Sequence, residues 1–115
     1  MRDVHEHLSK EDHECLHRCD ECHDVCLHAI QHCLEKGGRH AQPDHIRLLQ
    51  DCSQLCHVSA DFILRGSPLH GAVCEACAQV CEACAKSCAE LGDTECADHC
   101  RKCAESCHGM TAHRH

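Results

Sequence analysis

The chain has 115 residues and a net charge of −8, with 11 Lys and Arg against 19 Asp and Glu. This length allows one small domain, which we place over residues 1–115. The few, scattered basic residues exclude a phosphate-binding surface and thus nucleic acid as a partner, and no apolar run approaches the roughly 18 residues that span a membrane.

Two helices are predicted in the first half of the chain. The first covers about residues 9–36, because Ser9 offers an N-cap before an acidic first turn and Gly37 stops the pattern. The second covers about residues 43–65, because Pro43 is suited to the first helical position.

Two further helices are predicted in the second half. The third covers about residues 67–91, with Ser67 as its N-cap and Pro68 at its first position. The fourth covers about residues 94–108 and is capped by Asp93 or by its own first residue.

The connections between these helices are short, so neighbouring helices should run antiparallel. The predicted fold is therefore all-α, an up-down-up-down four-helix bundle with a Cys-lined core. The His-rich tails, residues 1–8 and 110–115, are expected to fray.

Cysteine replaces the usual core residues. Leu, Ile, Val and Phe together number only 19, about 17% of the chain, which is too few for an ordinary hydrophobic core. The 16 cysteines recur at steps of three and four, so each helix should carry its thiols on one stripe, within an arc of about 60–80°. These positions are Cys15, Cys19, Cys22, Cys26, Cys33, Cys52, Cys56, Cys74, Cys77, Cys81, Cys84, Cys88, Cys96, Cys100, Cys103 and Cys107.

Two structural explanations of these cysteines fit poorly. Residues four apart on a helix have Cβ atoms about 5–6 Å apart, whereas a disulfide needs about 3.5–4.5 Å. Bridges along one helix would therefore unwind it. Cysteine as a merely small buried hydrophobe would leave a poorly filled core that could not offset the entropy of folding.

Metal binding is the remaining explanation, and thiolates select Cu(I), Zn(II) or iron–sulfur clusters. Zinc sites use four ligands around one ion, with CxxC on a turn, and bacterial ferredoxin loops end in Cys-Pro, which this chain lacks. Cu(I) accepts two or three thiolates, and one ion can bridge residues i and i+4 of an intact helix. We therefore expect multiple Cu(I) ions per chain. A Zn(II)-thiolate buffer and an iron–sulfur, ferredoxin-like electron carrier remain as alternatives.

Two further ligands are predicted at one end of the bundle. His70 precedes Cys74 by four residues on the same stripe, and Met110 follows the fourth helix on its stripe. Both should lie near Cys15 and form a mouth for copper, because imidazole and thioether bind Cu(I) without losing a proton. His45 also falls on a stripe, at the opposite end near Cys33, Cys88 and Cys96, and is a further candidate ligand.

The chain resembles the cytosolic copper storage proteins, a family of cysteine-rich four-helix bundles. The resemblance extends over residues 12–110 and is carried by LLQDC (48–52), SADFILRGS (59–67), CEACAQVCEACAKSC (74–88) and CADHCRKCAESC (96–107), followed by Met110. It implies many Cu(I) ions held by inward thiolates along the bundle core. It also implies a homo-oligomer, with a tetramer suspected.

These observations predict a Cu(I) storage or sequestration protein that is not an enzyme. The N-terminal residues show no apolar region of a secretory signal, so we expect a cytoplasmic protein with reduced thiols. Its expected partners are copper ions and a copper chaperone or efflux system.

Overall fold

The computed structural model describes residues 8–112, which form four long helices and one short 3-10 helix. Residues 1–7 and 113–115, and with them most of the tails expected to fray, lie outside the described part. The elements are α1 (Lys10–Lys36), η1 (Gly38–Ala41), α2 (Pro43–Leu64), α3 (His70–Glu90) and α4 (Thr94–Ala112).

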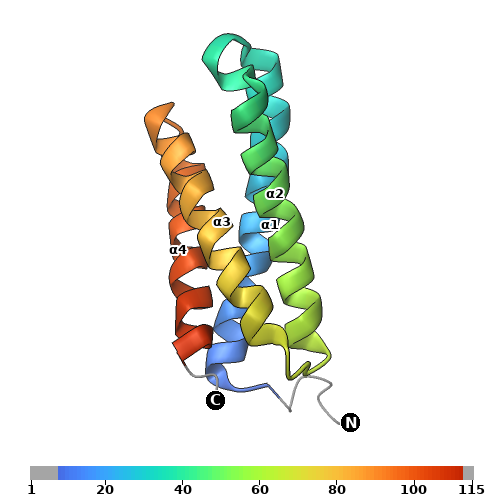
Figure 1. Cartoon of the computed structure of the whole chain (residues 1–115). Coiled ribbons are helices and arrows are strands. Elements are labelled where there is room, and N and C mark those ends of the chain that lie inside the picture. The colour runs from blue at the N-terminus through green and yellow to red at the C-terminus, as the bar shows by residue number, and fades with distance from the viewer. Residues whose placement is uncertain (1–7, 113–115) are drawn as a thin grey trace.

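The four helices form the expected up-down-up-down bundle, in which each helix packs against two neighbours. As Figure 1 shows, the start of α1, the turn between α2 and α3, and the end of α4 lie at one end of the bundle. The α1/α2 and α3/α4 connections lie at the opposite end. This topology brings the thiol stripes of all four helices to one central axis.

The helix boundaries follow local capping chemistry. The Ser9 hydroxyl accepts the Asp12 backbone N–H at 3.0 Å, and the Asp12 carboxylate accepts the Ser9 N–H at 2.9 Å. This reciprocal capping box fixes the start of α1. Gly37 ends α1 at φ 74°, a left-handed conformation that side chains disfavour.

The third helix begins at His70 and not at residue 67. The Ser67 hydroxyl accepts the N–H of Leu69 at 3.1 Å, and the Ser67 carbonyl accepts the N–H of His70 at 3.3 Å. Ser67 therefore closes a turn before the helix instead of capping it, and Pro68 lies within that turn.

The fourth helix continues to Ala112, four residues beyond its predicted end, so residues 110–112 do not belong to a frayed tail. It passes through Gly109, which costs about 1 kcal/mol relative to Ala in a helix. The side chain of Met110 is 6% exposed and packs on the core. Burying a Met side chain contributes about 1.5–3 kcal/mol, which offsets the glycine.

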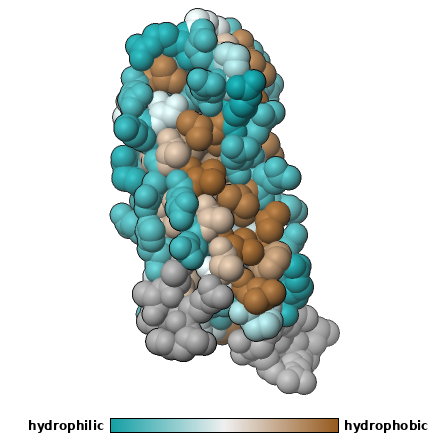
Figure 2. Space-filling view, in the orientation of Figure 1, coloured by the Kyte–Doolittle hydropathy of each residue, from teal (hydrophilic) through white to brown (hydrophobic). Residues whose placement is uncertain are grey.

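The core consists mainly of cysteine and alanine. Leu49 and Ile63 are the largest side chains that are essentially fully buried. Figure 2 shows hydrophobic residues in a stripe along one face, flanked by hydrophilic side chains on the outer faces of the helices. Within residues 8–112, no helix is long and apolar enough to cross a membrane.

Candidate metal centre

All sixteen cysteines are free thiols, and each is at most 1% exposed. They come from all four helices, because the three- and four-residue steps keep each stripe turned inward. The structure therefore brings together every cysteine that the sequence analysis selected.

The middle of the core is a network of thiols that crosses between helices. Cys22 Sγ lies 3.6 Å from Cys52 Sγ and 3.7 Å from Cys100 Sγ, on α2 and α4. Its distance to Cys26 Sγ, one turn along α1, is 4.0 Å. Cys52 Sγ reaches Cys81 Sγ on α3 at 3.5 Å. The shortest of these sulfur contacts are thus between helices and not along one helix.

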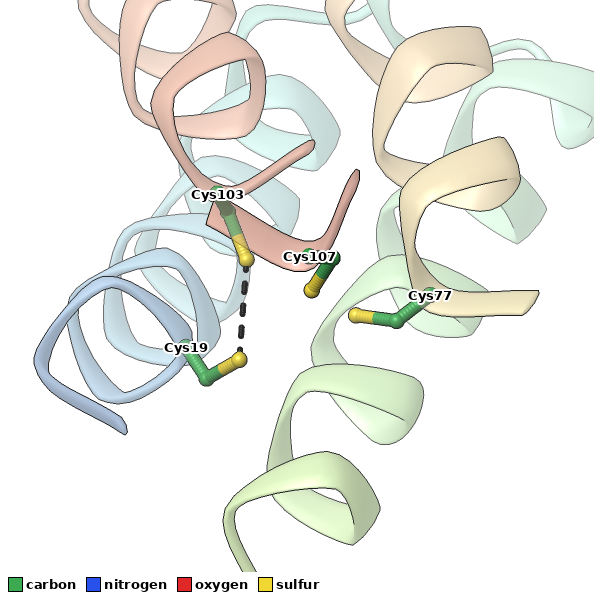
Figure 3. Close-up of side chains that lie close together, drawn as sticks. All are labelled: Cys19, Cys77, Cys103 and Cys107. Carbon is green, nitrogen blue, oxygen red and sulfur yellow. Dashed lines mark hydrogen bonds between the residues drawn. The ribbon is translucent and has the colours of Figure 1, made fainter. Parts of the chain in front are cut away.

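The same pattern continues toward the Met110 end. Cys56 Sγ lies 3.6 Å from Cys103 Sγ and 3.7 Å from Cys81 Sγ. Figure 3 shows the next layer, in which Cys103 Sγ lies 3.7 Å from Cys19 Sγ, with Cys77 and Cys107 alongside. The thiols therefore form a continuous column and not isolated pairs.

Several sets of thiols are close enough to share a metal ion, since their sulfur atoms lie within 4.8 Å of one another. A metal–thiolate bond of about 2.3 Å, as in zinc sites, lets one ion bridge two sulfurs up to about 4.6 Å apart. The sets include Cys19/Cys77/Cys103/Cys107, Cys22/Cys56/Cys81/Cys103, Cys22/Cys26/Cys52/Cys100, Cys26/Cys84/Cys96/Cys100 and Cys15/Cys74/Cys107. Several cysteines belong to two sets, which suits thiolates that bridge neighbouring ions.

Burial raises the pKa of the thiols, whereas a hydrogen bond between thiols lowers the pKa of one partner and raises that of the other. Burial raises the pKa of the Cys33 thiol above its usual value. Hydrogen bonds from Cys107 and Cys15 lower the pKa of Cys74 to about 4. A thiol of this network can therefore lose its proton while its neighbours donate hydrogen bonds to the thiolate.

The end of the core near Met110 carries both of the predicted additional ligands. Cys15 Sγ and Cys107 Sγ lie 3.9 Å apart there. Met110 borders an open pocket of about 260 Å³ whose lining includes Glu11 and Glu14. His70 is half-buried, and its Nδ1 donates to the Ser67 carbonyl oxygen at 3.0 Å. This bond leaves Nε2 as the nitrogen for a metal.

The opposite end contains a buried histidine, His45, which the sequence places on a stripe as a candidate ligand outside the predicted ligand set. His45 is 4% exposed. Its Nε2 lies 3.6 Å from Cys33 Sγ, and its Nδ1 lies 2.7 Å from Ser87 Oγ on α3. His45 and Ser87 lie 42 positions apart in the sequence, on α2 and α3, so the spacing along α2 could not indicate their contact.

A family model described as copper storage protein matches residues 8–112 of this chain. Among curated proteins, the uncharacterized cysteine-rich protein YhjQ of Bacillus subtilis is 33% identical over 66 residues. That alignment covers 57% of this chain and 61% of YhjQ, less than two thirds of the relative.

Solved structures match over nearly their whole length. Nmul_A1745 of Nitrosospira multiformis is 44% identical, with a TM-score of 0.87 and coverage of 90% of this chain and 96% of that one. The Cu(I)-bound copper storage protein BsCsp3 is 30% identical, with a TM-score of 0.82 and coverage of 89% and 99%. A cytosolic copper storage protein of Streptomyces lividans, with five coppers, is 29% identical, with a TM-score of 0.77 and coverage of 90% and 93%.

The family match spans all of the described residues, and it agrees with a buried column of free thiols in a four-helix bundle. This chain belongs to the copper storage protein family.

Proposed function

We propose that this protein stores Cu(I) by binding many ions to the thiolates along the axis of its bundle. The observation that carries the proposal is the continuous column of buried free thiols, with neighbouring sulfurs as close as 3.5–4.0 Å. The Cu(I)-bound state of BsCsp3, which shares this fold, supports the same use of the column here.

Charge favours a monovalent soft cation in this core. Sixteen buried thiolates without counterions would be prohibitively costly in a low-dielectric interior. One Cu(I) per thiolate makes the column neutral, whereas a four-thiolate zinc site retains two negative charges. The zinc-buffer and iron–sulfur alternatives are therefore not favoured, because many sites share the same thiols and the chain belongs to a copper storage family.

We assign the copper ligands to all sixteen cysteines, with His70 and Met110 as additional ligands at the mouth. His70 can use Nε2, because Nδ1 is bonded to the Ser67 carbonyl. Met110 can offer its thioether sulfur at the border of the open pocket. The acidic side chains of Glu11 and Glu14 on that pocket would attract a cation, although basic side chains also line it.

Family membership points to a non-enzymatic role. We place the protein in the cytoplasm, as the Streptomyces lividans relative is a cytosolic storage protein. We further propose a homo-oligomer, a tetramer by resemblance to the family, that exchanges copper with a chaperone or efflux system. The exposed leucines Leu27 and Leu34, two turns apart on α1, support contact between copies of the chain.

The test is an anaerobic Cu(I) titration of the reduced full-length protein, with metal and protein quantified in the same samples. We expect saturation near one Cu(I) per cysteine, on the order of 16 ions per chain. The product should be colourless, whereas an iron–sulfur protein would absorb visible light. Saturation at four ions or fewer, about one per four thiolates, would instead favour discrete zinc-like or iron–sulfur sites.

A further inference from the structure

His45 stands apart from the other histidines of the described chain by its burial. It lies in the first turn of α2, at the end of the bundle opposite Met110. Among residues 8–110 it is one of three buried polar residues, with Ser53 and Ser59, and its side chain is far larger than theirs. A polar ring in a core is unfavourable unless its nitrogens are paired, so its partners indicate its role.

Both ring nitrogens face groups from other helices. Nδ1 lies 2.7 Å from Ser87 Oγ on α3, and Nε2 lies 3.6 Å from Cys33 Sγ on α1. In the tautomer where Nδ1–H donates to Ser87, the lone pair of Nε2 points toward the Cys33 thiol. Histidines that bind metals show this arrangement, because a hydrogen bond from the second nitrogen fixes both tautomer and ring orientation.

The separation of the two donor atoms suits a shared ion. Metal bonds of about 2.0–2.1 Å to nitrogen and about 2.3 Å to sulfur place these atoms 3.6 Å apart when the angle at the metal is about 110°. An ion could therefore bind with little movement of either side chain. Imidazole and thiolate are both ligands for copper.

We propose that Cys33 and His45 form a mixed thiolate–imidazole Cu(I) site that closes the copper column at the end opposite Met110, with Ser87 as the positioning residue. The proposal rests on the storage function argued above and adds one protein ligand to it. Cys33 is the last thiol of α1, so His45 supplies a donor where the stripe of that helix ends.

The experiment follows the histidine nitrogens by NMR in ¹⁵N-labelled full-length protein during anaerobic loading with Cu(I), which is diamagnetic. We expect the Nε2 resonance of His45 to shift when copper binds, while Nδ1 remains protonated and hydrogen-bonded to Ser87. His57, which is largely exposed on the same helix, serves as the internal control and should not follow the same titration.

Two variants separate metal binding from a structural role. His45→Leu keeps an apolar volume but removes the donor, and we expect its capacity to fall by about one Cu(I) per chain. Ser87→Ala keeps the ring but frees it, and we expect full capacity with faster removal of the last ion by a Cu(I) chelator. His57→Leu is the matched surface control and should match the wild type in both measurements.

The outcomes distinguish this site from the storage function. Normal loading of the column with an unmoved His45 Nε2 resonance would overturn the mixed site and leave storage intact. A shift produced by Zn(II) but not by Cu(I) would overturn the choice of metal at this site. Failure of the whole column to load would overturn storage itself. The wild-type NMR result stands even if His45→Leu does not fold.

Discussion

Replacement of Leu49 by alanine tests how the metal-free bundle is held together. Leu49 is fully buried, and with Ile63 it is among the few large aliphatic side chains in a core of cysteine and alanine. Leu→Ala in a core costs about 2–5 kcal/mol, because the removed methyl groups leave a cavity. Few neighbouring side chains are large enough to fill that space, so we expect Leu49→Ala to lower the free energy of unfolding by about 3 kcal/mol.

For a domain of this size, about 3 kcal/mol corresponds to a fall in Tm of roughly 10–15 °C. The assay is thermal unfolding by circular dichroism of the reduced, metal-free protein. Leu69→Ala is the control, since Leu69 is 61% exposed and its loss should stay within about 0.5 kcal/mol. Copper capacity of the Leu49→Ala protein should not change, because Leu49 is not a ligand.

A Tm of the metal-free Leu49→Ala protein within about 2 °C of the wild type would refute this reasoning. That result would mean that the thiols and alanines alone supply the packing of the core. A Leu49→Ala protein that also lost copper capacity would mean that the thiol column depends on this side chain for its alignment.

The other predictions concern helicity, pH and the mouth. The metal-free, reduced protein should already be helical, because its caps and glycines do not involve metal, and a random-coil spectrum would indicate a fold nucleated by copper. Burial raises the pKa of Cys33, so the folded chain holds a proton that the unfolded chain loses above its pKa near 9.0. At neutral pH this thiol should therefore not affect the stability of the metal-free protein, but stability should fall as the pH rises past about 9. The fall should be less steep in the Cys33→Ala protein. Urea unfolding at several pH values measures both. Copper should be released as pH falls, because protons compete for the thiolates, and a chelator titration at several pH values measures this. The double variant His70→Ala/Met110→Leu should take up copper, or lose it to a chelator, more slowly than the wild type, while its capacity stays within about two ions of the wild type. Unchanged rates in the double variant, together with slowed rates in His45→Ala, would place the mouth at the opposite end.

The fold could be predicted because its determinants are local. Gly37 marked the end of α1 and Pro43 the start of α2 without any knowledge of tertiary contacts. The predicted helix ends were wrong where tertiary packing or a turn outweighed the local sequence pattern. Burial of Met110 carried α4 past Gly109, and hydrogen bonds of Ser67 within its own turn delayed the start of α3.

The site could be predicted only along each helix. The i,i+4 pairs are present, as Cys77 and Cys81 show with their sulfurs 3.8 Å apart. Contacts between helices, such as Cys52 with Cys81, depend on the rotation and axial offset of packed helices, which a spacing pattern does not fix. The partnership of His45 with Ser87 was missed for the same reason.

The two ends of the column differ in ways that bear on the direction of copper movement. At one end, Met110 borders an open pocket, and a thioether can hold Cu(I) without giving up a proton. At the other end, His45 is buried and fixed by Ser87, so a copper ion there would have no direct contact with solvent. If both proposals hold, ions loaded through the Met110 end must pass from thiolate to thiolate to reach Cys33. The sulfurs shared between neighbouring sets provide that path as far as Cys84 and Cys96, and the last transfer would run from there to Cys33. The Cys33–His45 site should then be the slowest to exchange, and a chelator added to the loaded protein should remove its ion last.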